Sequence, residues 1–253
     1  MIIKDEVIIT PWNDKRTLHI YLPNDYETSK QAYPVLYMYD GHNLFNDEDA
    51  TYGKAWGLSD YLDEQKLALI VVGIECDHEG NNRICEFSPY SFQTKQLGNI
   101  KGYGAIFMDW LVNELKPYID QHFRTLKGRE HCGIGGSSMG GLMALYSISN
   151  YNETFSKAAC LSSFLGDVID QLLPDLQQDL NLNTRIYLSW GSDEFKNKAR
   201  LVNGTSHNIK VANQLMLHHG QVYLNLIKHG EHSEACWEKE IPTFMNFLYN
   251  ELR

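Results

Sequence analysis

The chain has 253 residues and a mass of 29.1 kDa, a length at which single α/β domains are common. Hydrophobic residues make up 43% and charged residues 21%, so the chain can bury a large core, which excludes an intrinsically disordered or low-complexity protein. Its 22 basic and 32 acidic residues give a formal net charge of −10, which disfavours binding to nucleic acid or to an anionic membrane. We therefore expect one domain over residues 1–253.

The cysteines and the N-terminus exclude further classes of protein. The five cysteines contain no C-x-x-C pair, and their number is odd, so neither a disulfide framework nor a zinc site is expected. The N-terminus carries Asp5 and Glu6 where a signal peptide would be apolar. No apolar run approaches the ~18 residues of a membrane span. We therefore expect a cytoplasmic protein without a membrane segment.

Short apolar or β-branched runs alternate with helical patterns along the chain. The first runs, Val7–Ile9 and Leu18–Leu22, are expected to be antiparallel, half-exposed strands. The other predicted strands are Pro34–Tyr39, Leu67–Ile74, His131–Ile134, Lys157–Leu161, Arg185–Trp190 and Val222–Ile227. The predicted helices are Trp56–Lys66, Tyr103–Asp120 with a break or new start at Pro117, Met139–Ser149, Phe164–Leu180, Phe195–His219 and Glu234–Leu252. This alternation predicts an α/β fold, with a mostly parallel, twisted sheet and helices on both faces.

The region from Glu75 to Ile100 lacks clear periodicity and holds several turn signals. A loop of this length in a compact domain is usually functional, and the alternative is a surface excursion without a role.

The most informative stretch is Gly136-Ser137-Ser138-Met139-Gly140, which follows a predicted strand and opens a predicted helix. It fits G-x-S-x-G, a strained turn that exposes a serine hydroxyl and directs backbone N–H groups to the same point. Residues two before and two after the serine must be small for strand and helix to approach. Ser138 lies between glycines at these positions, whereas Ser137 would have the large Met139 at one of them. Ser138 is therefore the predicted nucleophile.

A serine hydroxyl needs a base, and in this arrangement the chain order is serine, acid, histidine. His229 and His232 follow the strand candidate Val222–Ile227, and we prefer His232 because it lies at the end of the loop, after the turn at Gly230. For the acid, Asp193 and Glu194 both follow a strand and a glycine turn, and spacing does not separate them.

At this point the sequence resembles the "putative esterase" branch of the α/β-hydrolase superfamily, whose members include esterase D, feruloyl esterases, siderophore esterases and mycolyltransferases. The resemblance runs over nearly the whole chain, in segments that keep the family order. They are Tyr39–Phe45, Val71–Glu75, Arg83–Pro89, Glu114–Asp120, Phe123–Thr125, Gly135–Gly141 and Gly230–Trp237.

The resemblance implies an α/β-hydrolase fold with Ser138 as nucleophile and His232 as base. It favours Glu194 over Asp193, because the family usually places the acid three residues after the turn glycine. It also implies that the segment Asp40–Phe45 is an oxyanion loop. The oxyanion donors would then be the backbone N–H of Met139 and that of His42 or Asn43. Arg83, Glu86 and Arg124 are expected to form structural pairs rather than to be catalytic.

The expected activity is hydrolysis of a small-molecule carboxylic ester through an acyl-enzyme, without a metal or an organic cofactor. An acyltransferase or a thioesterase could use the same triad, and a non-catalytic binding protein on the same fold is a further alternative. Neither nucleic acid nor a membrane is an expected partner, and a homo-oligomer is left open. The aromatic residues Tyr52, Trp56, Phe87, Tyr90, Phe92 and Phe164 are candidates either for the substrate pocket or for ordinary packing.

Overall fold

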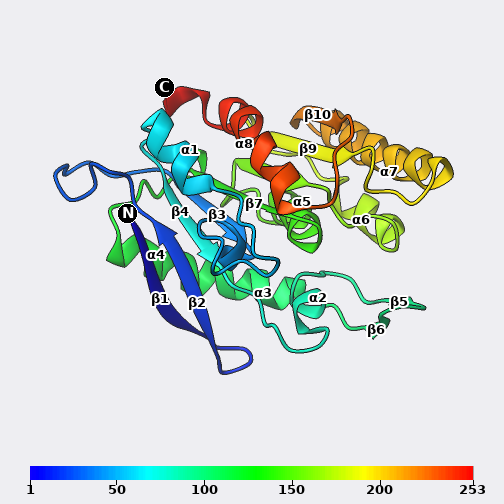
Figure 1. Cartoon of the computed structure of the whole chain (residues 1–253), viewed down its shortest axis with the longest axis horizontal. Helices are drawn as coiled ribbons and strands as arrows, with labels where there is room; N and C mark the ends of the chain where they lie inside the picture. The colour runs from blue at the N-terminus through cyan, green and yellow to red at the C-terminus, as the bar shows by residue number, and fades with distance from the viewer. Residues whose placement is uncertain (253) are drawn as a thin grey trace.

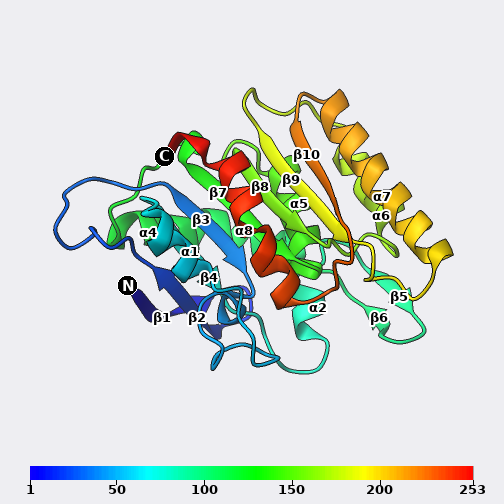
Figure 2. The same cartoon turned by 45° about the horizontal axis from the view of Figure 1, so that its top comes forward.

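In the computed structural model, which describes residues 1–252, an eight-stranded sheet crosses the molecule in the order β1-β2-β4-β3-β7-β8-β9-β10 (Figures 1 and 2). The strands are β1 (Ile2–Ile9), β2 (Asp14–Tyr21), β3 (Val35–Tyr39), β4 (Ile70–Ile74), β7 (Cys132–Ser137), β8 (Lys157–Leu161), β9 (Arg185–Gly191) and β10 (Gln221–Ile227). The pairs β1–β2 and β2–β4 are antiparallel, and the other neighbours are parallel. The mostly parallel sheet and its eight predicted strands are therefore confirmed, although β2 is more buried than expected.

Helices cover both faces of this sheet, as the alternation of patterns predicted (Figure 2). The helices are α1 (Leu58–Gln65), α2 (Asn82–Glu86), α3 (Gly104–Trp110), α4 (Lys116–His122), α5 (Met139–Asn150), α6 (Ile169–Asp175), α7 (Lys198–Leu217) and α8 (Glu234–Leu248). Helices α3 to α7 share one hydrophobic core with the sheet, and α1 and α8 share a second core with its other face.

The central strand β3 shows how the two cores arise from one short sequence. Tyr37 and Tyr39 belong to the core beneath α3 to α7, whereas Leu36 and Met38 belong to the core beneath α1 and α8. Successive side chains of a strand point to opposite faces, so a strand covered on both sides must be apolar at every position. All five residues of β3 are buried.

Two predicted helices differ from the structure. Residues 103–120 form α3, a π-helical turn at Leu111–Leu115 and then α4, so Pro117 lies in the first turn of α4 and the helical path continues. A proline inside a continuous helical path removes one backbone hydrogen bond, and here the π-helical turn directly before it departs from the regular α-helical pairing. The prediction Phe164–Leu180 was too long, since α6 covers only Ile169–Asp175 and contains Pro174 near its end.

The stretch from Glu75 to Ile100, expected to lack regular structure, contains α2 and a small hairpin of β5 (Phe92–Thr94) and β6 (Gly98–Ile100). These elements are three to five residues long, too short to show a periodic pattern. The hairpin projects away from the sheet (Figure 1).

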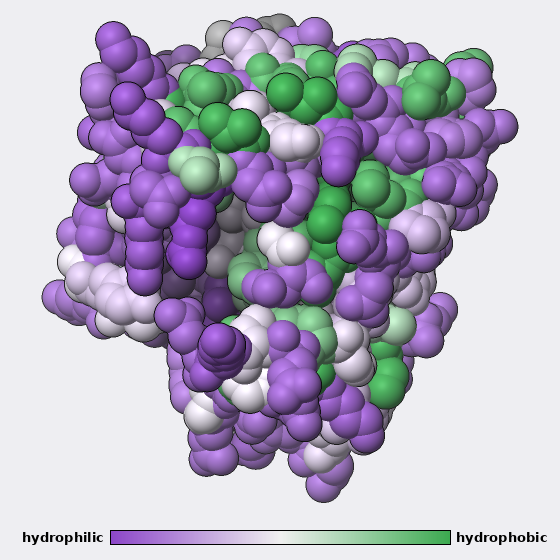
Figure 3. Space-filling model, turned by 90° about the vertical axis from the view of Figure 1, so that its right-hand side faces the viewer, coloured by the Kyte–Doolittle hydropathy of each residue, from purple (hydrophilic) through white to green (hydrophobic). Residues whose placement is uncertain are grey.

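The surface seen from the side of α7 and the hairpin is mostly hydrophilic, with separate hydrophobic areas between charged and polar side chains (Figure 3). Among residues 1–252, no helix has both the length and the hydropathy that a bilayer span requires.

Candidate active site

Ser138 lies at the sharp turn between β7 and α5, with φ 57° and ψ −117°. Positive φ is strained for a residue with a side chain, and it persists only where the surroundings enforce it. Here a Cβ on Gly136 would lie 2.9 Å from the carbonyl carbon of Gly140, so strand and helix approach as closely as the motif predicts. The Ser138 N–H donates to the Leu161 carbonyl at 3.0 Å, which ties the turn to the end of β8.

His232 lies in the loop between β10 and α8, and its Nδ1 is 3.2 Å from Oε2 of Glu194. The Glu194 side chain is only 8% exposed, and its Oε1 accepts hydrogen bonds from the Gly191 N–H at 2.6 Å and the Ser162 hydroxyl at 2.5 Å. Ser162 in turn accepts a hydrogen bond from Trp237 Nε1 at 2.9 Å. The carboxylate is therefore held in place on one side and presents its other oxygen to the imidazole.

The neighbouring residue Asp193 points elsewhere. Its Oδ2 lies 3.3 Å from Nδ1 of His229, and both side chains are at least half exposed. The two acids and the two histidines left open by the sequence thus form separate pairs, one in the site and one on the rim.

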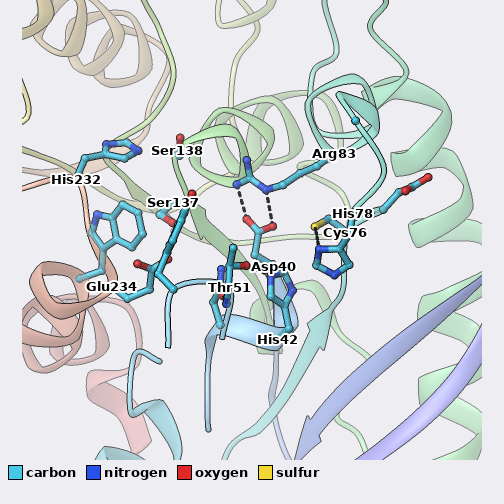
Figure 4. Close-up of a pocket in the computed structure, with 15 residues that line it drawn as sticks. Asp40, His42, Thr51, Cys76, His78, Arg83, Ser137, Ser138, His232 and Glu234 are labelled. Carbon is cyan, nitrogen blue, oxygen red and sulfur yellow. Dashed lines mark hydrogen bonds and ion pairs between the residues drawn. The ribbon is translucent and has the colours of Figure 1, made fainter. Parts of the chain in front are cut away.

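A cavity of about 330 Å³ lies beside Ser138 and His232 (Figure 4). The close-up shows the His232 ring next to Ser138, with Asp40 and Arg83 on the other side of the serine. Ser138 and His232 also line a second hollow of about 450 Å³, which reaches Phe164 and Arg200. The nucleophile candidate therefore has space on two sides.

The expected oxyanion loop borders this cavity. His42 and Asn43 lie in a 3-10 turn, Gly41–Asn43, directly after β3, and both line the cavity. The Asn43 N–H donates to the Asp40 carbonyl at 2.9 Å, so it is already used within the turn. Met139 is the first residue of α5, where backbone N–H groups lack helical partners.

The sequence did not indicate that Arg83 pairs with Asp40, the first residue of the expected oxyanion loop. Arg83 Nε and Nη2 each donate to one carboxylate oxygen of Asp40 at 2.7 Å, in a bidentate pair. Burial would raise the pKa of Asp40, but the charge and hydrogen bonds of Arg83 outweigh it and the pKa is lowered. The expected structural role of Arg83 agrees with this pair. Its place in the cavity wall has no local signal, because 43 residues separate the partners.

The other two residues expected to form structural pairs lie away from the cavity. Glu86 forms a buried ion pair with Arg16 at 2.7 Å, and the Arg124 guanidinium lies over the Tyr26 ring. Of the aromatic candidates, Tyr52 and Phe164 line the two hollows, and Trp56 and Phe87 are buried in the core. Tyr90 and Phe92 pack against the core, and Phe92 contacts Phe164.

Sequence comparison decides the family. The family described as "Putative esterase" matches residues 10–248. The chain belongs to this esterase family. Carboxylic ester hydrolysis is accordingly its class of reaction, as the sequence resemblance predicted.

Individual relatives of this esterase are distant in sequence. The uncharacterized protein YbbA of Bacillus subtilis strain 168 is 22% identical over 251 residues, which cover 94% of each protein. Esterase Rv1288 of Mycobacterium tuberculosis H37Rv is 28% identical over 151 residues, or 58% of this chain and 28% of that larger protein.

Solved structures show the same α/β-hydrolase fold. An IroE-like serine hydrolase from Shewanella oneidensis superposes with a TM-score of 0.81 at 18% identity, covering 99% of this esterase and 81% of that chain. The enterobactin esterase FES from Shigella flexneri gives 0.75 at 17% identity, covering 100% and 60%. The siderophore hydrolase EstB from Aspergillus nidulans gives 0.74 at 14% identity, covering 98% and 96%.

Proposed function

We propose that this esterase hydrolyses small-molecule carboxylic esters through an acyl-enzyme on Ser138. His232 is the general base, and Glu194 orients its imidazole. The observation that carries the proposal is the 3.2 Å contact between Glu194 Oε2 and His232 Nδ1, beside the cavity that also exposes Ser138. Orientation through Nδ1 leaves Nε2 of the ring to exchange protons with the serine.

Ser138 Oγ attacks the ester carbonyl carbon while His232 accepts the hydroxyl proton. The imidazolium, stabilised by the Glu194 carboxylate, then protonates the leaving alcohol as the carbon–oxygen bond breaks. Water attacks the acyl-enzyme next, and His232 takes a proton from that water and returns it to Ser138. The products are the alcohol and the carboxylic acid.

The tetrahedral intermediates place negative charge on the former carbonyl oxygen. We assign the Met139 N–H as one donor to this oxygen and the His42 N–H as the other. His42 is preferred to Asn43 because the Asn43 N–H already donates to the Asp40 carbonyl. Each donor of this kind typically contributes about 2.7–4 kcal/mol to transition-state stabilisation.

The two hollows on either side of Ser138 fit an ester with substantial groups on both its acyl and its alcohol side. Structural neighbours include proteins named as enterobactin, ferulic acid and siderophore hydrolases. We therefore propose that the substrate is a small-molecule ester with a bulky group on each side of the ester bond, as the two hollows can accept.

The experiment compares wild type, Ser138→Ala and Ser137→Ala with p-nitrophenyl acetate and with a serine-directed fluorophosphonate. Ser137 is the matched control, because it is the adjacent serine in the same turn. We expect Ser138→Ala to lose at least 10³-fold in kcat/KM and to form no adduct, whereas Ser137→Ala still forms one at Ser138. Wild-type activity in Ser138→Ala, with a native circular dichroism spectrum, would contradict the proposal.

A further inference from the structure

Three potential metal ligands meet in the wall of the cavity, on the side away from His232. One nitrogen each from His42 and His78 and the sulfur of Cys76 all lie within 4.8 Å of one another. Cys76 Sγ is 3.8 Å from His78 Nδ1, and the two imidazole rings meet edge to face with centroids 4.7 Å apart. Figure 4 shows the three side chains grouped beside Asp40.

The backbone brings these residues together from two loops. His42 follows β3, and Cys76 and His78 follow the neighbouring strand β4. Gly41 lies directly against Gly73, since a Cβ on Gly41 would come within 2.3 Å of the Gly73 carbonyl carbon. This contact packs the turn that carries His42 directly against β4, the strand that leads to Cys76 and His78.

His42 has one nitrogen that the protein leaves without a partner. The residue is 4% exposed, and its Nδ1 is buried without a hydrogen bond. Its other nitrogen, Nε2, lies 2.9 Å from the Thr51 hydroxyl. If Nε2–H donates to Thr51, Nδ1 carries a buried lone pair. Buried polar atoms of this kind are rare because they lose a hydrogen bond to water. A histidine that binds a metal through one ring nitrogen usually donates a hydrogen bond from the other, which fixes the orientation of the ring.

We propose that His42, Cys76 and His78 form a binding site for a borderline-soft divalent metal ion of the Zn²⁺ type. One thiolate and two imidazoles are ligands that zinc prefers, and three protein ligands leave the fourth tetrahedral position open to the cavity. Metal–ligand bonds of about 2.0–2.3 Å imply ligand-to-ligand distances of about 3.5 Å. The distance of 3.8 Å between Cys76 Sγ and His78 Nδ1 is already close to this value. His78 is exposed, so its side chain can move to shorten the remaining ligand-to-ligand distances.

Metal binding is balanced by loss of the Cys76 thiol proton to solvent, since only the thiolate coordinates. In the metal-free chain the sulfur of Cys76 contacts Nδ1 of His78 at 3.8 Å, and the metal would replace that contact. Asp40 retains its bidentate pair with Arg83 and is not required as a ligand. The ion would thereby link the oxyanion loop to the segment after β4.

The test is titration of the metal-free protein with Co²⁺, followed by absorption spectroscopy. We expect one equivalent to give a thiolate-to-cobalt charge-transfer band, together with the intense visible bands of tetrahedral cobalt. Zn²⁺ should displace the cobalt and abolish both. Cys76→Ser should lose the charge-transfer band, and His78→Gln should weaken cobalt binding by at least tenfold. Cys85→Ser is the matched control and should behave as wild type, because Cys85 lies outside the cluster.

Absence of a charge-transfer band in wild type, or its persistence in Cys76→Ser, would overturn the proposal. Cys76 is buried, so its replacement could disturb folding, whereas His78 is exposed and its replacement should not. Unchanged cobalt affinity in a folded His78→Gln would therefore also refute the site. None of these measurements uses ester hydrolysis, so their outcome is independent of the proposed function.

Discussion

Gly191 and Gly230 touch backbone to backbone, and a Cβ on Gly191 would come within 2.2 Å of the Gly230 carbonyl oxygen. The same two loops are joined by the Asp193 N–H, which donates to that carbonyl at 2.9 Å. Glu194 lies three residues after one glycine, and His232 lies two residues after the other. The close contact between the glycines therefore sets the distance between the proposed acid and base.

Replacing Gly191 with alanine should separate these loops. The added methyl group would meet backbone atoms, which cannot move aside as a flexible side chain can. A displacement of about 1 Å in a catalytic group can cost about 10²-fold, so we expect Gly191→Ala to lower kcat/KM by roughly that factor. Steady-state kinetics on p-nitrophenyl esters measures the effect. The control is Gly166→Ala, because a Cβ at Gly166 meets no atom within 4 Å. Equal activities of the two variants would refute the argument.

The identity of the acid can be tested by comparing Glu194→Gln with Asp193→Asn. Glutamine keeps the shape of the side chain but removes the charge that stabilises the imidazolium. We therefore expect Glu194→Gln to lower kcat on the order of 10³-fold or more. Asp193 contacts His229 at the exposed rim, so Asp193→Asn should change kcat by no more than about twofold. The reverse order of effects would assign the acid to Asp193.

Arg83 should stabilise the folded state by neutralising Asp40. Arg83→Met leaves a buried carboxylate without its partner, and we expect a loss of roughly 3 kcal/mol in the free energy of unfolding. This is the lower end of the usual range because the Arg83 side chain is 32% exposed. Urea denaturation at pH 7 measures the change. The double variant Asp40→Asn/Arg83→Met removes the unpaired charge and should regain part of the loss. A double variant no more stable than Arg83→Met would contradict this interpretation.

Glu240 should make stability depend on pH. Burial raises its pKa to about 7, although the hydrogen bond from the Tyr187 hydroxyl at 2.7 Å lowers it. Because the pKa is higher in the folded state, the stabilisation is fully present below the unfolded pKa of about 4.3 and is lost as pH rises through about 7.

Glu240→Gln replaces the titrating carboxyl with an amide, so the contribution of this residue to stability no longer changes with pH. Between pH 5 and pH 8, the unfolding free energy of wild type should fall by on the order of 3 kcal/mol more than that of the variant. Urea denaturation at the two pH values measures this difference. Glu238→Gln is the control, because Glu238 is 40% exposed and pairs with Lys54. A parallel pH dependence of wild type and Glu240→Gln would show that Glu240 does not carry the effect.

The elements that local sequence patterns could predict are those that extend over several residues. The apolar run Leu67–Ile74 predicted a strand covered on both faces, and its end forms β4, buried at every position. The hairpin of β5 and β6 was not predicted, because a strand of three residues is too short to show the alternation of apolar and polar residues.

The sequence by itself predicted the alternation of strands and helices and the sharp turn that Ser138 occupies between a strand and a helix. A serine between two glycines, after a strand and before a helix, has one favourable way to turn, so a local pattern is sufficient. Spacing alone left Glu194 and Asp193 open and the family resemblance favoured Glu194, whereas the tertiary structure turns Glu194 towards His232 and Asp193 towards His229. The Asp40–Arg83 pair and the cluster of His42, Cys76 and His78 likewise depend on how distant loops pack. Such contacts follow from the packing of backbones, which no local pattern records.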